Sequence, residues 1–232
     1  MEMLDRIILI IHIACGTISL ILFWVPVIVK KGSKVHNQVG RLYVIAMAGV
    51  IITSLMLSVI NVLQGHIIMA AFLSYLALLT GQPLWYAFTI VKHKKMVPLN
   101  VVKILKTLKY LLVIFGLILI GWSIALSLKG LSILLLIFGS IGCLSSISGI
   151  RMPIHQIATK TNWLYEHVSG MIVSGIAAYT AFFAFGGSQF LANFLPGPLA
   201  AIPWILPTVI GVVLIKRYKK TNPKMRTQTN QY

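Results

Sequence analysis

The first apolar stretch of the chain reads IILIIHIACGTISLILFWVPVIV over residues 7–29, and KKGSK follows at once over residues 30–34. The stretch contains no charged residue and matches the roughly 20 residues that a helix needs to cross the hydrocarbon core of a bilayer. A cleaved signal peptide is disfavoured, because the run is too long and no small-residue cleavage site precedes the two lysines. The stretch therefore predicts a retained membrane-spanning helix, and this decides the class of fold.

Apolar stretches of this kind recur along the whole chain. Of its 232 residues, 58% are hydrophobic and only 10% are charged. A soluble domain carries about a quarter charged residues, so this chain is expected to fold in lipid. Because a spanning segment must satisfy its own backbone hydrogen bonds there, we expect an all-α bundle of about seven transmembrane helices. The predicted spans are Ile7–Val29, Leu42–Leu63, Ile67–Val91, Tyr110–Leu128, Leu131–Ile150, Trp163–Phe185 and Leu199–Ile215.

The basic residues between these spans alternate between two sides of the predicted membrane. Eighteen of the 20 Lys and Arg residues fall on one side, and only Arg6 and Lys129 fall on the other. Short cytoplasmic loops carry an excess of Lys and Arg, so the N-terminus is predicted outside and the C-terminus inside. The same distribution argues against nucleic-acid binding, which needs basic residues gathered on one folded face. The basic segments are 30–41, 92–109, 151–162 and the tail from residue 216.

The connections on the outer side are short, which predicts antiparallel neighbouring helices in a single domain over residues 1–220. The polar tail over residues 221–232 is predicted to be disordered. The basic segment 92–109 is expected to lie as an amphipathic stretch against anionic lipid headgroups at the cytoplasmic face. The lipid bilayer is therefore the expected partner, while assembly into a homo- or hetero-oligomer stays open.

Small residues along the apolar spans are interpreted as helix-packing positions. Cys15 and Cys143 lie inside apolar runs without a CxxC partner, so neither a disulfide framework nor a metal site is predicted. The span Leu131–Ile150 places several small residues on one broad face, which is typical of close helix contacts. These residues are Gly139, Gly142, Ser146 and Gly149.

The few polar residues inside the spans are the candidates for function, because an ionisable group at bilayer depth is energetically costly. His12 lies about two turns inside the first span, beside the small or polar residues Gly16, Thr17 and Ser19. A ligand-binding or proton-relay histidine has this setting, and so does a histidine that bonds across a helix interface. Both interpretations stay open.

A second candidate is the Glu166–His167 dipeptide at the inner end of the sixth span. His167 shares one helix face with Gly170 and Ser174 and, further along, Ala178 and Ala181, so its imidazole is predicted to point into the bundle. Glu166 has two interpretations. It either favours the positive end of a helix that Asn162 caps, or it forms a proton or cation site with His167.

Haem ligation by two histidines is an alternative for a helical bundle. His12 and His167 are predicted to lie roughly 15 Å apart along the membrane normal, so one iron does not bridge them. Two haems would need His66 as the partner of His12, and His36 or His155 as the partner of His167. We otherwise expect no cofactor.

A motif before and within the second span resembles a known family. The stretch HNQVGRLY over residues 36–43 has the pattern His-x-x-x-Gly-Arg-x-Tyr, with His12 upstream and WLYEH over residues 163–167 downstream. These features resemble a group of small bacterial membrane proteins that form a domain-of-unknown-function family, although this chain has Asn37 where the family has Arg. The resemblance implies a polytopic protein of the bacterial inner membrane and adds weight to His12, His36, Arg41 and His167. A plain interpretation of the motif is headgroup anchoring, with Tyr43 in the interfacial belt.

The sequence therefore favours a non-enzymatic integral membrane component or a small-molecule or proton carrier. It contains no Gly-x-Ser-x-Gly, HExxH or P-loop motif, which argues against hydrolysis. The alternative is a membrane redox protein that binds haem or quinone through His12 and the inner histidines. The candidate site residues are His12, His36, Arg41, Tyr43, Glu166 and His167.

Overall fold

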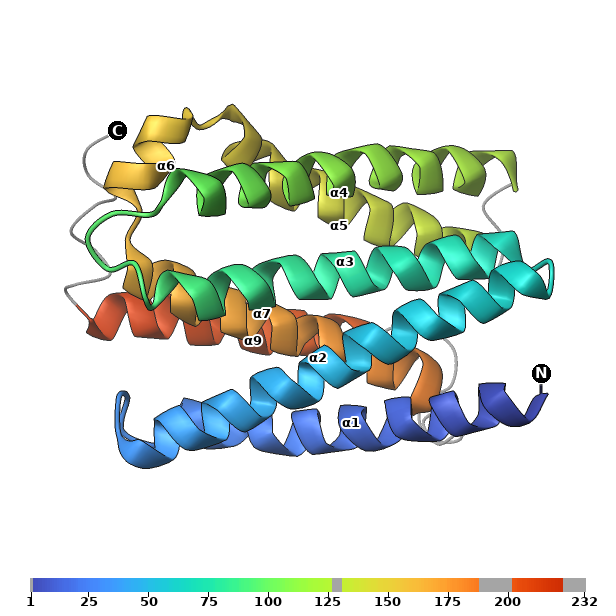
Figure 1. Ribbon diagram of the computed structural model, residues 1–232, viewed down its shortest axis with the longest axis horizontal. Helices are drawn as coiled ribbons and strands as arrows, with labels where there is room; N and C mark the ends of the chain where they lie inside the picture. Colours follow the sequence, from blue (N-terminus) through green and yellow to red (C-terminus); the bar gives the residue numbers. More distant parts are fainter. Residues whose placement is uncertain (1, 127–130, 188–201, 223–232) are drawn as a thin grey trace. The chain divides into compact units, whose positions relative to one another are not determined.

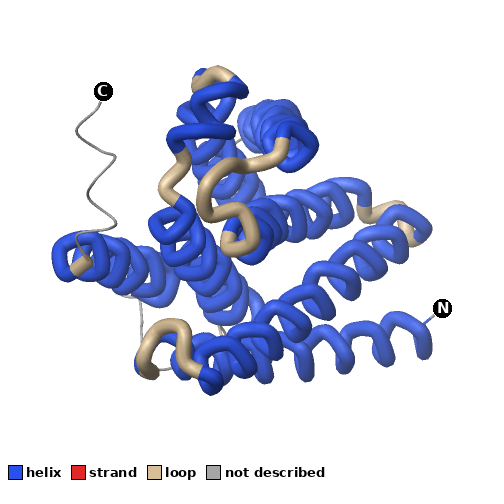
Figure 2. Tube along the Cα trace, turned by 60° about the vertical axis from the view of Figure 1, so that its left-hand side comes forward, coloured by secondary structure: helices blue, strands red, loops and turns tan. Residues whose placement is uncertain are grey.

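The computed structural model describes residues 2–126, 131–187 and 202–222, and all regular secondary structure in these residues is helical (Figures 1 and 2). The all-α prediction is therefore confirmed for the described part of the chain. The helices are α1 (Glu2–Ile28), α2 (Lys34–Leu63), α3 (Ile67–Ile90), α4 (Leu99–Ala125), α5 (Leu131–Arg151), α6 (Ile154–Lys160), α7 (Trp163–Ala181), the π-helix η1 (Phe182–Gly186) and α9 (Ile202–Thr221).

Five helices, α1 to α5, are long and apolar enough to cross a membrane. Their outward faces are strongly apolar, since Ile10 is 66% exposed and both Ile21 and Ile45 are 67% exposed. Water penalises such surfaces, whereas lipid does not, so the helices are compatible with a multi-pass membrane protein. The helices α7 and α9 occupy the sixth and seventh predicted spans, and the count of seven spans stays a prediction.

Two helices begin well before the apolar runs from which the membrane spans are predicted. Helix α2 begins at Lys34 rather than Leu42, and α4 begins at Leu99 rather than Tyr110. The apolar runs mark the depth of lipid, but a helix continues past them where long basic side chains reach toward water. The first turns of α4 show this, because Val102 and Leu105 are buried there while Lys103 is exposed. The basic segment 151–162 likewise contains the short helix α6.

Some predicted features lie outside the described residues. These are the outer connection at Lys129–Gly130, residues 188–201 with the start of the seventh predicted span, and residues 223–232 of the predicted tail.

Contacts divide the chain into two compact units. The first unit comprises Met1–His12, Gly49–Gln82 and Lys92–Thr161, and the second comprises Ile13–Ala48, Pro83–Val91 and Asn162–Tyr232. Helices α1, α2 and α3 therefore contribute one part to each unit. The predicted single domain over residues 1–220 stays a prediction.

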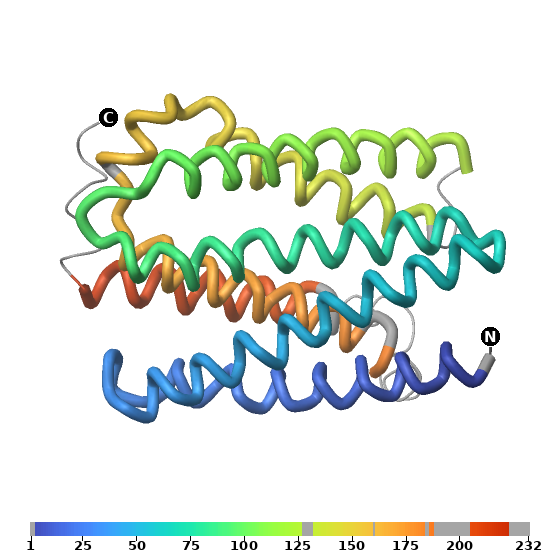
Figure 3. Tube along the Cα trace, in the orientation of Figure 1, coloured from blue at the N-terminus to red at the C-terminus, as the bar shows by residue number. Residues whose placement is uncertain are grey.

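Within the first unit, α4 and α5 lie side by side, and small residues allow their close approach (Figure 3). A Cβ atom added at Gly139 would lie 2.8 Å from the carbonyl oxygen of Gly116, and one at Gly116 would lie 2.8 Å from the Sγ atom of Cys143. The hydroxyl of Tyr75 on α3 occupies the space beside Gly142 and donates to the carbonyl of Leu112 at 3.2 Å. The packing interpretation of the small-residue face on α5 is therefore confirmed.

Within the second unit, α7 and α9 lie side by side, and glycine again sets the spacing (Figure 3). A Cβ atom at Gly211 of α9 would collide with Ile176 of α7. A Cβ atom at Gly175 of α7 would collide with the ring of Phe23 of α1. The second unit thus packs the later half of α1 and the middle of α9 against α7, which carries the candidate site residues Glu166 and His167.

Candidate functional site

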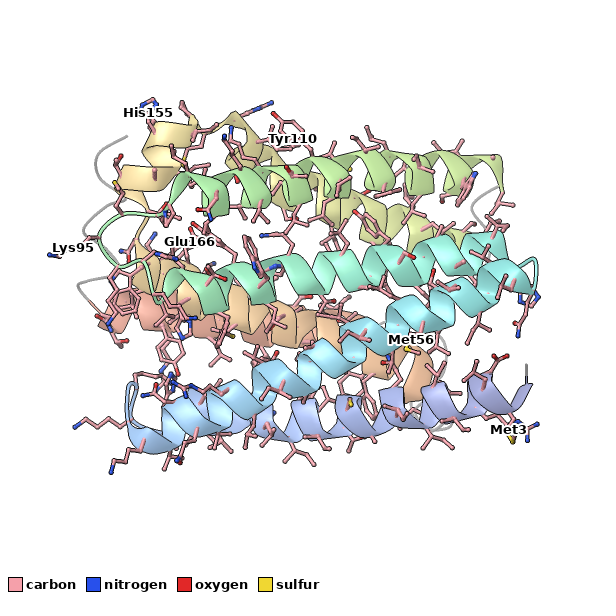
Figure 4. The ribbon with its side chains drawn as sticks, viewed as in Figure 1. Met3, Met56, Lys95, Tyr110, His155 and Glu166 are labelled. Carbon is pink, nitrogen blue, oxygen red and sulfur yellow. The ribbon has the colours of Figure 1, made fainter. Side chains whose placement is uncertain are left out.

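The start of α7 is fixed by a side-chain cap. The Oδ1 atom of Asn162 accepts the backbone N–H groups of Leu164 and Tyr165, both at 3.2 Å. Glu166 lies in the first turn, where a carboxylate interacts favourably with the positive end of a helix (Figure 4). The cap predicted from the sequence is therefore confirmed, and it sets the register of the next residue, His167.

His167 is held against the end of α3. Its Nδ1 atom lies 2.9 Å from the carbonyl oxygen of Ala87, and since a carbonyl only accepts, Nδ1 carries the proton. Three residues on, a Cβ atom at Gly170 would lie 2.7 Å from the Cβ atom of Ala87 and 2.8 Å from the carbonyl oxygen of Pro83. The predicted packing face of His167 and Gly170 is thus confirmed for these two residues, because α3 and α7 touch along it.

His36 makes the corresponding bond to α1. Its Nδ1 atom lies 3.2 Å from the carbonyl oxygen of Pro26, so this nitrogen is also the protonated one. Pro26 and Ala87 both lie in the last turns of their helices, where backbone carbonyls lack a partner within the helix. Both imidazoles therefore close a helix C-terminus with Nδ1, and in the neutral ring the lone pair stays on Nε2.

The two imidazoles also face each other. The ring centroids of His36 and His167 are 6.4 Å apart, with 68° between the ring planes. The ammonium of Lys31 lies within electrostatic range of both rings. We call His36 and His167 the histidine pair. It offers two basic nitrogen atoms, held by main-chain anchors, for a proton or a ligand.

Tyr43 connects the same two helices two turns further on. It is 3% exposed, and its hydroxyl lies 2.7 Å from the Oγ atom of Ser174. Because Ser174 donates its own proton to the carbonyl of Met171, Tyr43 is the donor. Tyr43 is therefore a buried contact within the second unit, and its place at a membrane interface stays a prediction.

These contacts fix the relative direction of α2 and α7 within the second unit. His36 meets His167, and seven residues later on both helices Tyr43 meets Ser174. Seven residues make about two helical turns, so equal steps on both helices mean that the helices run parallel there. Arg41, between these contacts, is exposed on α2.

His12 belongs to the first unit and makes a bond across a helix interface. Its Nδ1 atom lies 2.9 Å from the Oγ1 atom of Thr53 on α2, and Thr53 itself donates to the carbonyl of Gly49 at 2.7 Å. This contact is the one that the packing interpretation of His12 expects. It accounts for one imidazole nitrogen, and the functional interpretation stays a prediction.

The two remaining histidines proposed as haem partners lie at exposed positions. His66 follows the end of α2, and His155 lies on α6, where Figure 4 labels it. The structure brings His36, rather than an exposed histidine, to His167. Within the described residues, no group of three or more His, Cys, Asp or Glu side chains is arranged to hold a metal ion.

The sequence did not indicate which groups hold or face the two rings of the histidine pair. The carbonyls of Pro26 and Ala87 and the ammonium of Lys31 were not among the candidate residues. The available signal was positional, since Lys30, Lys31 and Gly32 mark the end of a helix next to His36.

Comparison with known proteins adds no relative. No protein-family profile, curated protein or solved structure matches this chain.

Proposed function

We propose that the chain is an integral membrane protein of the bacterial inner membrane that carries a small molecule together with protons. In this proposal it has seven transmembrane helices, with the N-terminus outside and the C-terminus inside. The five long apolar helices and the distribution of basic residues support the membrane placement. The resemblance of the His36 to Tyr43 stretch to a family of small bacterial membrane proteins points the same way.

The parallel contact between α2 and α7 supports the proposed topology. Helices that start on the same side of a membrane are separated by an odd number of other spans. Helices α3, α4 and α5 supply three spans between α2 and α7, provided that the short helix α6 does not cross. Both α2 and α7 then begin at the basic, cytoplasmic side.

The histidine pair is the observation that carries the proposal. Its rings are close enough that two positive charges would repel, so the pair is expected to take up one proton at a time. The proton is accepted at Nε2, which leaves both Nδ1 bonds to the helix ends intact. Since His36 is anchored to α1 and His167 to α3, a charge on the pair acts on four helices of the second unit at once.

We expect proton uptake and proton-coupled transport to depend on both imidazoles. In purified protein with ¹⁵N-labelled histidine, an NMR titration should show one proton entering the pair before the second. In vesicles loaded with a pH-sensitive dye, amines, carboxylates and sugars serve as probes, and one class should drive proton movement. His36→Gln and His167→Gln should each reduce that movement at least about a hundredfold, which is the low end for loss of a proton-transfer group.

The exposed histidines supply the matched controls. His66→Gln and His155→Gln remove an imidazole of the same kind outside the pair, and both should leave proton movement unchanged. Equal behaviour of all four variants, or independent titration of His36 and His167, would contradict the carrier proposal.

A redox function is the second candidate, and the Nδ1 bonds favour it too. Histidines that bind a metal through Nε2 commonly donate Nδ1–H to a main-chain carbonyl, as His36 and His167 both do. A haem held by this pair would supply electron transfer, and a quinone is an alternative redox ligand. Protein expressed with ample haem should then show a Soret band that His167→Gln abolishes. A colourless protein under these conditions excludes the haem function and leaves the carrier proposal unaffected.

A further inference from the structure

An apolar cavity of about 190 Å³ lies within the second unit between α1, α7, η1 and α9. Its walls include the aromatic rings of Phe23, Trp24 and Tyr179 and the side chains of Ile210 and Leu214. Trp24 is 37% exposed and Ile210 is 38% exposed, so the cavity opens at the surface of the helices. The surface there faces lipid if the helices span a membrane.

The polar side-chain atoms of Trp24 and Tyr179 in the cavity wall already have hydrogen-bond partners within the protein. The Nε1 atom of Trp24 donates to the hydroxyl of Tyr179 at 2.7 Å, and this hydroxyl donates to the carbonyl of Leu20 at 2.7 Å. The wall therefore presents rings and aliphatic carbon to an occupant. An extended hydrocarbon chain suits such a lining, whereas a polar solute would lose its hydration without gaining a partner.

The same helix faces become cationic beyond the cavity. Arg217 and Tyr218 follow Leu214 by three and four residues, so they continue the cavity-lining face of α9. The hydroxyl of Tyr218 donates to the carbonyl of Val27 on α1 at 2.6 Å, and the Nζ atom of Lys31 lies 4.8 Å from the centroid of the Tyr218 ring. Further basic residues flank these positions in the sequence, namely Lys30, Lys34, Lys216 and Lys220.

We propose that this site binds an anionic phospholipid, with part of one acyl chain in the cavity and the phosphate against Lys31 and Arg217. The seven residues from Ile210 to Arg217 span roughly 10 Å along the helix. The basic residues therefore lie beyond the apolar cavity along the helix axis, as the phosphate of a lipid lies beyond its acyl chains. A zwitterionic lipid has the same chains but no net charge to match the cluster. The site adjoins the histidine pair, because Lys31 Nζ also donates to the carbonyls of Pro26 and Val27, and the Pro26 carbonyl accepts from His36 as well. Lipid binding here does not depend on the proposed carrier function.

The test is lipid binding to the detergent-purified protein, followed by native mass spectrometry. Dioleoyl phosphatidylglycerol should bind at least about tenfold more tightly than dioleoyl phosphatidylcholine, because its headgroup has a net negative charge to match two cations, whereas choline cancels the phosphate charge. Glycerol 3-phosphate, which has the headgroup chemistry without chains, should not compete. Equal binding of the two lipids, or competition by glycerol 3-phosphate, would overturn the proposal.

Two pairs of variants separate the charge from the cavity. Arg217→Gln should lose most of the preference for phosphatidylglycerol, whereas Lys103→Gln, which removes an exposed charge on α4, should keep it. Ile210→Trp should weaken both lipids by filling the cavity mouth, whereas Val212→Trp should not, because Val212 is exposed on the opposite face of α9. Leu206→Trp is a second way to fill the cavity if the first variant folds poorly. If Lys103→Gln lost as much of the preference as Arg217→Gln, the preference would come from the overall charge of the protein, and the proposed site would be wrong.

Discussion

Gly142→Ala is expected to lower the free energy of unfolding by about 3 kcal/mol, although it adds a single methyl group. The added Cβ atom would fall on the hydroxyl of Tyr75, which is 2% exposed and has no open space to enter. Moving the ring breaks the bonds from this hydroxyl to the carbonyls of Leu112 and Gly139, which are 3.2 and 3.3 Å long. The measurement is unfolding of the purified protein in mixed micelles by a denaturing detergent.

Two further variants make the cause specific. Gly121→Ala on α4 is the matched control, because a Cβ atom there meets nothing within 4 Å and should leave stability equal or slightly higher. Tyr75→Phe removes the hydroxyl, so combining it with Gly142→Ala should recover part of the loss in a double-mutant cycle. Additive effects of the two changes would show that Tyr75 is not what Gly142 accommodates.

The sequence predicted those parts of the fold that depend on local composition. The apolar runs predicted the positions of the five long helices in the described residues, because a helix that crosses a bilayer must be both long enough and apolar. The Asn162 cap was predictable, since a capping side chain bonds to backbone groups two and three residues ahead. The small-residue face of α5 was predictable for a similar reason, because close helix contacts need small side chains at helical spacing.

The parts that depend on distant contacts could not be predicted in this way. His36 and His167 belong to helices far apart in the sequence, and nothing local to either indicates the other. Their anchors are the main-chain carbonyls of Pro26 and Ala87, and any residue type can supply a carbonyl. The apolar runs also do not mark the starts of α2 and α4, because Lys34 and the first turns of α4 are helical although they are too polar to belong to an apolar run.

Gly170→Ala is expected to destabilise the protein by about 2 kcal/mol and to disturb the histidine pair as well. The new Cβ atom would lie 2.7 Å from the Cβ atom of Ala87 and 2.8 Å from the carbonyl oxygen of Pro83. The second contact is backbone and cannot rotate away, so α3 and α7 must separate. His167 lies one turn earlier on the same face, and its 2.9 Å bond to the Ala87 carbonyl lengthens with that separation.

This coupling can be measured without knowing any substrate. In ¹⁵N-histidine NMR spectra, the Nδ1 proton of His167 should exchange with water faster in Gly170→Ala, while that of His12 stays as it is. Gly16→Ala, where a Cβ atom meets nothing within 4 Å, is the helical glycine control in the same unit. Adding Ala87→Gly should recover part of both losses, because it removes one of the two collisions. An unchanged Nδ1 proton in Gly170→Ala would mean that the Pro26 and Ala87 anchors hold the histidine pair independently of how closely α3 and α7 pack.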